Sequence, residues 1–218
     1  NGSFLSNNGK SGATFYVNNR DREYYDHNGD NFSELPKLKD NTFGANFFFK
    51  PANSQKIELN FGSLHEYRYG GEMIDGAPHF AMQSEERVHD FLVGNIDYSI
   101  DFNSGNSSLI TYGAGQKTNR EHYTGIRPDI GSSEDLEHLT NPPYGTSFNI
   151  TTQFGLQLNH KYTQFIGPNV LTIGSEVVSD YVNDEISSYN YLIDQNVNTL
   201  AIYLQSDWSL TEKFSLLS

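Results

Sequence analysis

The sequence predicts an all-β chain that forms part of a transmembrane antiparallel up-and-down β-barrel. Three observations support this fold class: apolar and polar residues alternate with period two, short and long connections alternate along the chain, and acidic charge gathers in the long connections. From Phe91 to Phe102 the even-numbered residues are apolar or glycine, whereas the odd-numbered ones become polar and acidic. Successive side chains of a strand point to opposite faces, so one face avoids water and the other accepts it.

The same alternation recurs from Phe148 to Asn159, where the second face carries Asn, Thr and Gln. Such side chains make a poor hydrophobic core, because each buried polar group needs a partner, but they suit the wall of a water-filled lumen. The apolar face is then expected to contact lipid. The residues predicted to face the lumen are Glu58, Asp97, Asp101, Gln153, Gln157 and Asp207.

The composition is compatible with a barrel and excludes a membrane-spanning helix. The chain has 218 residues, of which 36% are hydrophobic, and it contains no apolar run of about 18 residues. Barrel strands need only about 9 to 11 residues, half of them polar, so their hydropathy averages out. The absence of cysteine, with 14 Tyr and 15 Phe, fits an envelope protein without disulfides and with aromatics for membrane interfaces.

Period-two segments predict eight strands and the start of a ninth. The segment 108–116 is the least clear, because neither of its faces is cleanly apolar. The predicted strands cover residues 13–19, 43–50, 56–65, 91–102, 108–116, 148–160, 169–178 and 198–209, and a last one begins at Phe214.

The connections between these strands are of two kinds that alternate. Short turns are expected at 51–55, 103–107, 161–168 and 210–213, and long loops at 20–42, 66–90, 117–147 and 179–197. The long loops hold most of the acidic residues, so the net charge of −13 is concentrated at one end. Outer-membrane barrels have short periplasmic turns and long outer loops. An aromatic girdle is predicted at the periplasmic end from Phe49, Phe102, Phe165, Trp208 and Phe214.

Three stretches of the sequence resemble the TonB-dependent outer-membrane receptors. The first is S-L-H-E-Y-R-Y-G-G at 63–71, followed by A-P-H at 77–79 and S-E-E-R-V-H at 84–89. The second is V-L-T-I-G-S-E-V-V-S-D at 170–180, and the third is Y-L-Q-S-D-W-S-L-T-E-K-F-S-L-L at 203–217. The third stretch resembles the strand, periplasmic turn and next strand found within these barrels.

The resemblance implies a 22-stranded barrel with an N-terminal plug, which takes up a scarce ligand with energy from TonB. Residues 1–218 would then be a single, incomplete domain from the middle of the barrel, without the plug. The implied location is the bacterial outer membrane. The implied partners are the lipid bilayer, the TonB complex through the missing plug, and a small-molecule ligand such as an iron chelate, haem or cobalamin; no nucleic acid is expected.

No segment presents a nucleophile elbow, a phosphate-binding loop or a metalloprotease helix, so we expect neither enzymatic activity nor a cofactor. Aromatic and guanidinium groups supply rigid contact area and anion pairing at recognition sites. The candidate ligand-binding residues are Tyr67, Arg68, Tyr69, His79, Arg120 and Tyr123, all in the predicted outer loops.

Two weaker metal hypotheses arise from the same loops. Asp26, Asn28 and Asp30 could hold calcium, although the segment departs from the EF-hand pattern, and a solvated turn is the alternative. A haem or soft metal could use side chains of the second long loop, where ordinary exposed loop residues are the alternative. The side chains concerned are His65, Met73, His79, Met82 and His89.

Two other architectures stay open at this point. One is a small independent eight-stranded outer-membrane barrel, and the other is an extracellular β-sandwich that binds glycans with its loops. A sandwich buries its apolar face against a second sheet, whereas a barrel exposes that face as a continuous belt. The residues that distinguish the two are Leu92, Ile96, Ile150, Leu156 and Ile202.

Overall fold

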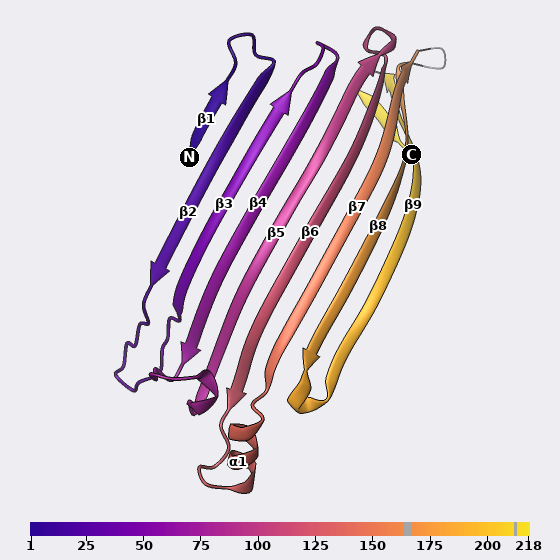
Figure 1. Cartoon of the computed structure of the whole chain (residues 1–218). Helices are drawn as coiled ribbons and strands as arrows, with labels where there is room; N and C mark the ends of the chain where they lie inside the picture. The colour runs from indigo at the N-terminus through magenta and orange to yellow at the C-terminus, as the bar shows by residue number, and fades with distance from the viewer. Residues whose placement is uncertain (164–166, 212) are drawn as a thin grey trace.

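The computed structural model describes residues 1–163, 167–211 and 213–218. Ten strands form one sheet in which the spatial order follows the chain and every neighbouring pair is antiparallel (Figure 1). The strands are β1 (Gly2–Leu5), β2 (Ser11–Arg22), β3 (Lys37–Phe49), β4 (Gln55–Gly71), β5 (Gln83–Phe102), β6 (Ser107–Ile126), β7 (Tyr144–Tyr162), β8 (Asn169–Ile186), β9 (Tyr191–Thr211) and β10 (Phe214–Leu217).

The strands are longer than the sequence pattern predicts, and much of what was expected as long loops is strand. In the structure, the connections that correspond to the predicted long loops cover only 23–36, 72–82, 127–143 and 187–190. The loops were predicted too long because period-two alternation marks a strand only where one of its faces is apolar. Beyond the apolar belt both faces carry polar side chains, so the alternation disappears while the backbone ladder continues.

Short elements were also missed by the sequence. β1 is too short to show a pattern, and helix α1 (Ser133–Thr140) lies within a predicted loop. Ser132 caps this helix, because its side chain accepts a hydrogen bond from the Asp135 amide. The remaining helical turns are η1 (Pro78–Phe80), η2 (Asn103–Gly105) and η3 (Ser187–Tyr189). Within the described ranges, no helix has the length and apolar character needed to cross a membrane.

The two ends of the sheet differ as the alternating connections predict, with one exception. Strands β1, β3, β5, β7 and β9 end at the upper end of Figure 1, whereas α1 and the wider connections lie at the lower end. The exception is the connection between β8 and β9, which is a tight hairpin of residues 187–190 instead of a long loop.

Residues directly opposite each other in the ladder share a face of the sheet, which defines two surfaces. The apolar face carries Leu92, Ile96, Ile150, Leu156 and Ile202, whose exposed fractions run from 38% for Ile150 to 75% for Ile202. In the described part of the chain there is one sheet only, and no second sheet covers this face. The burial required by a β-sandwich is therefore missing. Because β1 and β10 do not pair with each other, the described strands form an open sheet rather than a small closed barrel.

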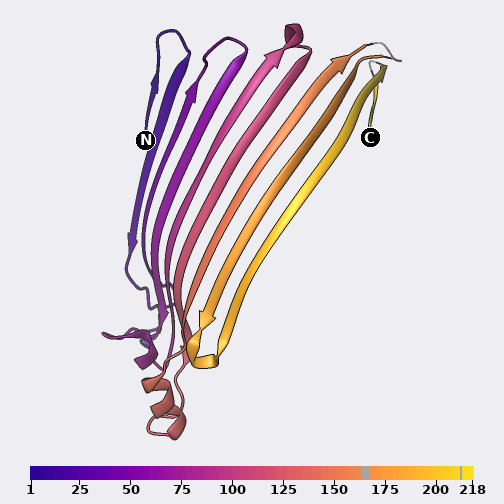
Figure 2. The same cartoon turned by 45° about the vertical axis from the view of Figure 1, so that its right-hand side comes forward.

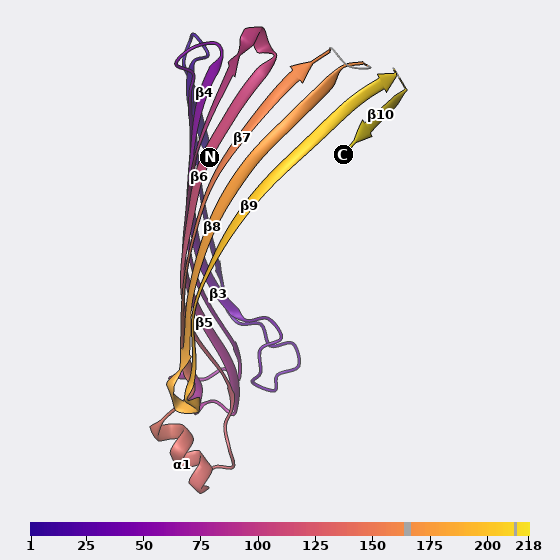
Figure 3. The same cartoon turned by 90° about the vertical axis from the view of Figure 1, so that its right-hand side faces the viewer.

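The sheet is curved, as Figures 2 and 3 show, and the connection between β2 and β3 lies on the inside of the curve (Figure 3). The apolar belt on β5 runs from Leu92 to Phe102. Ten rises of about 3.3 Å give roughly 33 Å along the strand, which at a barrel-like tilt of about 40° makes a belt about 25 Å tall. This is the height of the lipid-facing band of outer-membrane barrels.

Aromatic rings pack across glycines on the opposite, polar face. Tyr112 lies directly over Gly155 on the next strand, and Tyr203 lies over Gly174, so a Cβ at either glycine would overlap the ring. Such cross-strand pairs let the backbone bend while the ring covers it. They place tyrosine hydroxyls on the polar face, where Tyr203 donates to Gln157 Oε1 at 2.9 Å.

Candidate ligand-binding site

The ladder places all six residues predicted to face the lumen on the polar face. Their neighbourhood is connected by hydrogen bonds: Gln153 Nε2 donates to Glu176 Oε2 at 2.8 Å, and Thr151 Oγ1 donates to Asp180 Oδ1 at 2.6 Å. Glu176 and Asp180 on β8 thus have hydrogen-bond partners on the adjacent strand β7, as polar groups of a membrane protein require. That this face lines a lumen stays a prediction, because the sheet is open.

Beyond the apolar belt, the polar face carries a compact group of basic side chains. We call it the basic band; it consists of Arg68 on β4, Arg87 and His89 on β5, and Arg120 and His122 on β6. Arg68 lies directly opposite Arg87, which lies opposite His122, and His89 lies opposite Arg120. Directly opposite side chains have Cβ atoms about 5 Å apart, and like charges in such pairs are destabilising.

The basic band is only partly neutralised by its neighbours. Arg87 Nη2 pairs with Glu85 Oε1 at 2.5 Å, and His89 Nδ1 lies 3.9 Å from Glu66 Oε1. Among the described residues, Arg68 and Arg120 form no ion pair, and the Nε atom of Arg120 is buried without a hydrogen-bond partner.

The pKa values of the two histidines of the band are lowered, mainly by burial and partly by neighbouring positive charges. Burial lowers the pKa of His122, and Arg120 lowers it further, while Asp184 on β8 opposes the shift. The pKa of His89 is also lowered, first by burial; Glu66 opposes the shift and Arg120 adds to it. The Nδ1 atom of His122 is buried and has no hydrogen-bond partner among the described residues. The guanidinium groups of Arg68 and Arg120, which no described carboxylate neutralises, are the groups of the band that can pair with an anion.

A pocket of about 660 Å³ adjoins the basic band at the outer end of the polar face. Arg68 and Glu85 line it from the sheet, Ser33 and Pro36 from the connection between β2 and β3, and Tyr189 from the β8–β9 hairpin. Pockets of about 300 to 1,000 Å³ are the size that small ligands occupy. The pocket and the band share Arg68, so together they form the candidate ligand-binding site.

Of the six predicted ligand-binding residues, only Arg68 and Arg120 lie in this site. Tyr67, Tyr69 and Tyr123 lie on the apolar face, and His79 lies in η1. Tyr67 donates to Glu86 Oε1 at 3.0 Å, and burial raises its pKa. The structure thus separates residues that the sequence grouped, because neighbours in a strand point to opposite faces.

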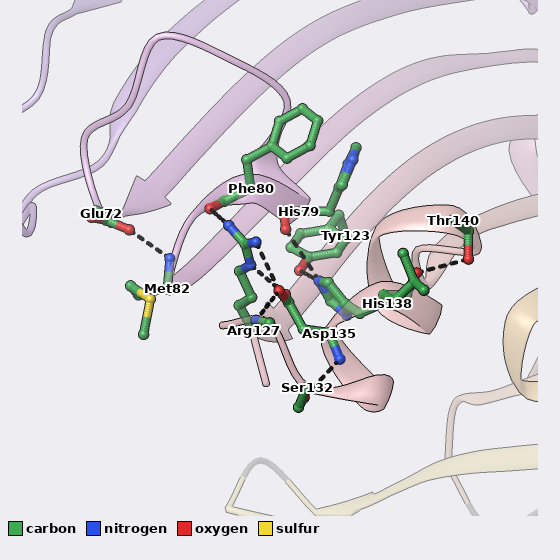
Figure 4. Close-up of polar contacts among 12 residues, drawn as sticks. Glu72, His79, Phe80, Met82, Tyr123, Arg127, Ser132, Asp135, His138 and Thr140 are labelled. Carbon is green, nitrogen blue, oxygen red and sulfur yellow. Dashed lines mark hydrogen bonds and ion pairs between the residues drawn. The ribbon is translucent and has the colours of Figure 1, made fainter. Parts of the chain in front are cut away.

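Residues 72–82 and 127–143, which include η1 and α1, form a cap over Tyr123 (Figure 4). The Tyr69 hydroxyl donates to the carbonyl of Glu72 in this cap at 2.8 Å. Tyr123 has no exposed surface, and Tyr69 has 3%. The Tyr123 hydroxyl lies 3.1 Å from His138 Nε2, and His79 Nδ1 lies 2.9 Å from the Tyr144 hydroxyl. Burial raises the pKa of Tyr123 to about 12. Tyr69 and Tyr123 are therefore buried in the contact between the cap and the sheet, and ligand binding by them or by His79 stays a prediction.

Arg127 connects the two parts of the cap: it forms an ion pair within residues 127–143 and donates a hydrogen bond to residues 72–82. Arg127 donates to both carboxylate oxygens of Asp135, at 2.6 and 3.1 Å, and to the Phe80 carbonyl at 3.2 Å (Figure 4). The Gly131 amide also donates to Asp135, at 2.9 Å. The Arg127 guanidinium holds the pKa of Asp135 at about 2, below its ordinary 3.8. Because both carboxylate oxygens of Asp135 accept from Arg127, this ion pair also fixes the relative orientation of the two side chains.

The cap is expected to loosen in acid in two stages. The pKa of His79 is lowered from 6.5 by burial and by His138 and Arg127, so its stabilising contribution is complete above pH 6.5 and declines below it. The contribution of Asp135 is present above pH 3.8 and is lost as the pH falls toward about 2. Hydrogen exchange of residues 127–143, corrected for intrinsic rates, should be faster at about pH 5 than at about pH 7.5.

The variant His79→Gln serves as the control, because it removes the first stage and leaves the second. Equal corrected exchange rates of the original protein at the two pH values would show that His79 does not govern the cap.

The residues of the calcium hypothesis, Asp26, Asn28 and Asp30, lie in a turn where their side-chain oxygens already accept hydrogen bonds. Both carboxylate oxygens of Asp26 accept backbone amides, from Gly29 at 2.7 Å and Asn31 at 3.0 Å, and Asp30 Oδ1 accepts the Phe32 amide at 2.8 Å. Asn28 Oδ1 accepts the Asp30 amide. These bonds make a closed polar turn, and calcium binding there stays a prediction.

The candidate haem or soft-metal side chains do not converge. His65 lies on the apolar face and His89 on the polar face, so the sheet separates them. Over the described ranges, no group of three His, Cys, Asp or Glu side chains is arranged to hold a metal ion.

Most of the predicted girdle aromatics lie beside short connections. Phe49 ends β3, Phe102 ends β5 and Phe214 begins β10, and all three are exposed. Trp208 pairs with Asn169 at the start of β8. Phe165 lies outside the described residues. Their common depth in a membrane stays a prediction.

An open, curved antiparallel sheet with an exposed apolar belt and a hydrogen-bonded polar face resembles a section of the wall of a large outer-membrane receptor barrel. Solved structures show this resemblance directly. The chain aligns over 96% of its length with the siderophore receptor PirA from Acinetobacter baumannii, at 13% identity and a TM-score of 0.58. It aligns over 93% with the ferric yersiniabactin uptake receptor FyuA from Yersinia pestis (9% identity, TM-score 0.50) and over 95% with the ferric citrate transporter FecA (14%, 0.50).

The resemblance to TonB-dependent receptors is thus confirmed at the level of the fold. The chain spans about a third of each of these structures, covering 38%, 32% and 32% of their lengths. No protein-family model and no curated protein matches the sequence.

Sequence reasoning missed Arg87 and His122 as members of the site. Both lie within segments that were expected to be long loops, 66–90 and 117–147, where no strand register can be assigned. The signal that was present is the spacing Arg87-x-His89 and Arg120-x-His122, which places each pair on one face once the segments are strands.

Proposed function

We propose that this chain is a section of the barrel wall of a bacterial outer-membrane receptor, and that its polar face binds an anionic iron chelate during TonB-driven uptake. The observation that carries this proposal is the pairing of Arg68 with Arg87 directly across the strands, next to the unpaired Arg120. An arrangement of like charges costs free energy in the absence of an anion and gains it back when an anion binds.

The choice among ligands follows from charge. An anionic ferric chelate, or haem through its propionates, complements the basic band, whereas cobalamin and neutral oligosaccharides lack the charge to do so. The names of the three similar structures, which are receptors or transporters of siderophores or ferric citrate, favour the iron chelate. The basic band consists of hydrogen-bond donors, and such a set of donors is suited to binding and releasing an anion.

A binding screen tests this function. The receptor that carries this chain, purified from outer membranes, is titrated with ferric citrate, a catecholate ferric siderophore, haem, cobalamin and a neutral oligosaccharide. We expect one of the anionic chelates to bind, and its affinity to fall as salt rises. Preferential binding of cobalamin or the oligosaccharide, without salt dependence, would contradict the proposal.

A further inference from the structure

Four large side chains with apolar surface interrupt the polar face next to the basic band, on the side toward the short connections. Leu64 lies directly opposite Phe91 in the row that adjoins the band, and Tyr16 and Val93 share the following row. All four are at least partly exposed. We call this group the apolar shelf. Exposed apolar side chains that cluster on a face otherwise suited to water indicate contact with a ligand or partner.

Two glycines let the shelf form a continuous surface. A Cβ at Gly44 would overlap the Tyr16 ring, so this ring lies across the backbone of β3. A Cβ at Gly62 would stand 3.3 Å from Val93 Cγ1 and 3.8 Å from the Tyr16 hydroxyl oxygen, so the ring and Val93 approach each other across β4. Tyr16 is nevertheless 39% exposed. Its ring therefore has one side on the sheet and the other open to an aromatic ligand.

The two rows outward of the shelf carry an excess of positive charge. From β2 to β6 they contain five arginines and two carboxylates, Asp40 and Glu66. Arg20 Nη2 lies 2.6 Å from Asp40 Oδ2, and Glu66 Oε1 lies 3.9 Å from His89 Nδ1. Glu85, one row further out, pairs with Arg87. The excess therefore remains after these carboxylates are counted. The five arginines are Arg20, Arg22, Arg68, Arg87 and Arg120.

The shelf and the band are close enough to contact one small ligand together. Successive rows on one face of a sheet are about 6.6 Å apart, twice the rise per residue of a strand. Arg120 is the diagonal neighbour of Phe91 across β5 and β6, within reach of a long side chain. A ligand that covers the shelf and also pairs with the band must therefore carry negative charge directly beside an apolar surface.

A catecholate meets this requirement because its oxyanions are attached to the aromatic ring itself. The ring can stack on aromatic side chains while the oxygens accept from guanidinium groups. A hydroxycarboxylate such as citrate has the charge but no ring, so it would leave the shelf uncovered.

We propose that the apolar shelf makes the ligand-binding site selective for an iron chelate that carries catecholate rings. The rings contact Tyr16 and Phe91, and the oxyanions pair with Arg120 and Arg68. The shelf and the band face one space, because the connection between β2 and β3 lies inside the curve of the sheet and lines the pocket together with Arg68 (Figure 3). This inference rests on the proposed function and names the class of chelate that the site takes.

Equilibrium titration of the receptor that carries this chain tests the selectivity. The purified protein is titrated at one salt concentration with the ferric complex of dihydroxybenzoate, with ferric citrate and with haem, and we expect the catecholate complex to bind most tightly. Phe91→Leu and Tyr16→Leu keep an apolar side chain but remove a ring. Each should lower the affinity for the catecholate complex about two- to tenfold and leave that for ferric citrate unchanged.

Tyr203→Leu is the matched control. Tyr203 also lies across a glycine of the polar face, Gly174, and is 40% exposed, but it belongs to β9, whereas the basic band lies on β4 to β6. Its replacement should leave both affinities unchanged. Tighter binding of ferric citrate or haem by the original protein would overturn the inference. So would a Phe91→Leu variant that loses affinity for both iron complexes equally, or for neither.

The same titration separates this inference from the function on which it rests. If the receptor binds no anionic iron chelate, the proposed function fails. If it binds ferric citrate more tightly than the catecholate complex, and this affinity falls with salt and in Arg120→Gln, the proposed function stands and only the role of the apolar shelf fails.

Discussion

Replacing Arg120 with glutamine is expected to lower the affinity of the receptor for an anionic iron chelate by about ten- to a hundredfold. A hydrogen bond to a charged group contributes about 1.5 to 3 kcal/mol, and each 1.4 kcal/mol is tenfold in affinity. Arg120 is suited to this role because its Nε atom is buried without a partner and no carboxylate of the described residues neutralises it. Equilibrium titration of the receptor with the chelate found in the screen measures the effect.

Two further variants make this result specific. Arg68→Gln should weaken binding similarly, because Arg68 belongs to the basic band and lines the adjoining pocket. Lys39→Gln removes the same charge from the opposite face, where Lys39 lies 3.8 Å from Asp21, and should change affinity little. If Lys39→Gln weakens binding as much as Arg120→Gln, the effect is one of net charge, and the basic band is not the site.

Replacing Tyr123 with alanine is expected to detach the cap from the sheet while ligand affinity stays unchanged. Removing a large buried aromatic side chain costs about 3 to 5 kcal/mol, and Tyr123 has no exposed surface. The substitution removes the ring that lies 5.2 Å from that of Tyr144 and the contact with His138. Limited proteolysis within residues 127–143 and hydrogen exchange at η1 measure the detachment.

The conservative variant Tyr123→Phe keeps the ring and loses only the hydroxyl contact, so it should loosen the cap by about 1 kcal/mol. The pair of variants also tests the original assignment of Tyr123 as a ligand contact. A large loss of chelate affinity in Tyr123→Phe, with the cap still closed, would return Tyr123 to the binding site and contradict the placement of that site on the polar face.

The faces of the membrane-level strands could be predicted from the residues alone. Ile96 and Asp97 occupy adjacent positions with opposite character, and the ladder places each where the alternation predicted. The outer halves of the strands could not be predicted in this way. Around residues such as Arg87 and His89 neither face of the strand is continuously apolar, so no hydrophobic period marks the strand that carries them.

The candidate ligand-binding site could not be predicted fully, because its residues lie on the parts of the strands whose pairing the sequence pattern did not reveal. The sequence singled out Arg68 and Arg120 by residue type, but also Tyr69 and Tyr123, which the fold buries under the cap on the opposite face. Side-chain chemistry alone cannot separate these two groups, because both are aromatic or basic residues near the ends of strands. The separation comes from the parity of each residue within its strand and from the packing of α1 and η1.

By itself the sequence determined that one face of this chain meets an apolar medium and the other meets water, because alternation is a local property that each strand carries in its own residues. Only the tertiary structure decided that Arg68, Arg87 and Arg120 lie together. These residues come from three strands, and their proximity depends on hydrogen-bonded register between strands, which is a relation among distant segments. The local residue pattern therefore predicted the two faces of the sheet, and the pairing between strands brought the basic residues together on the polar face.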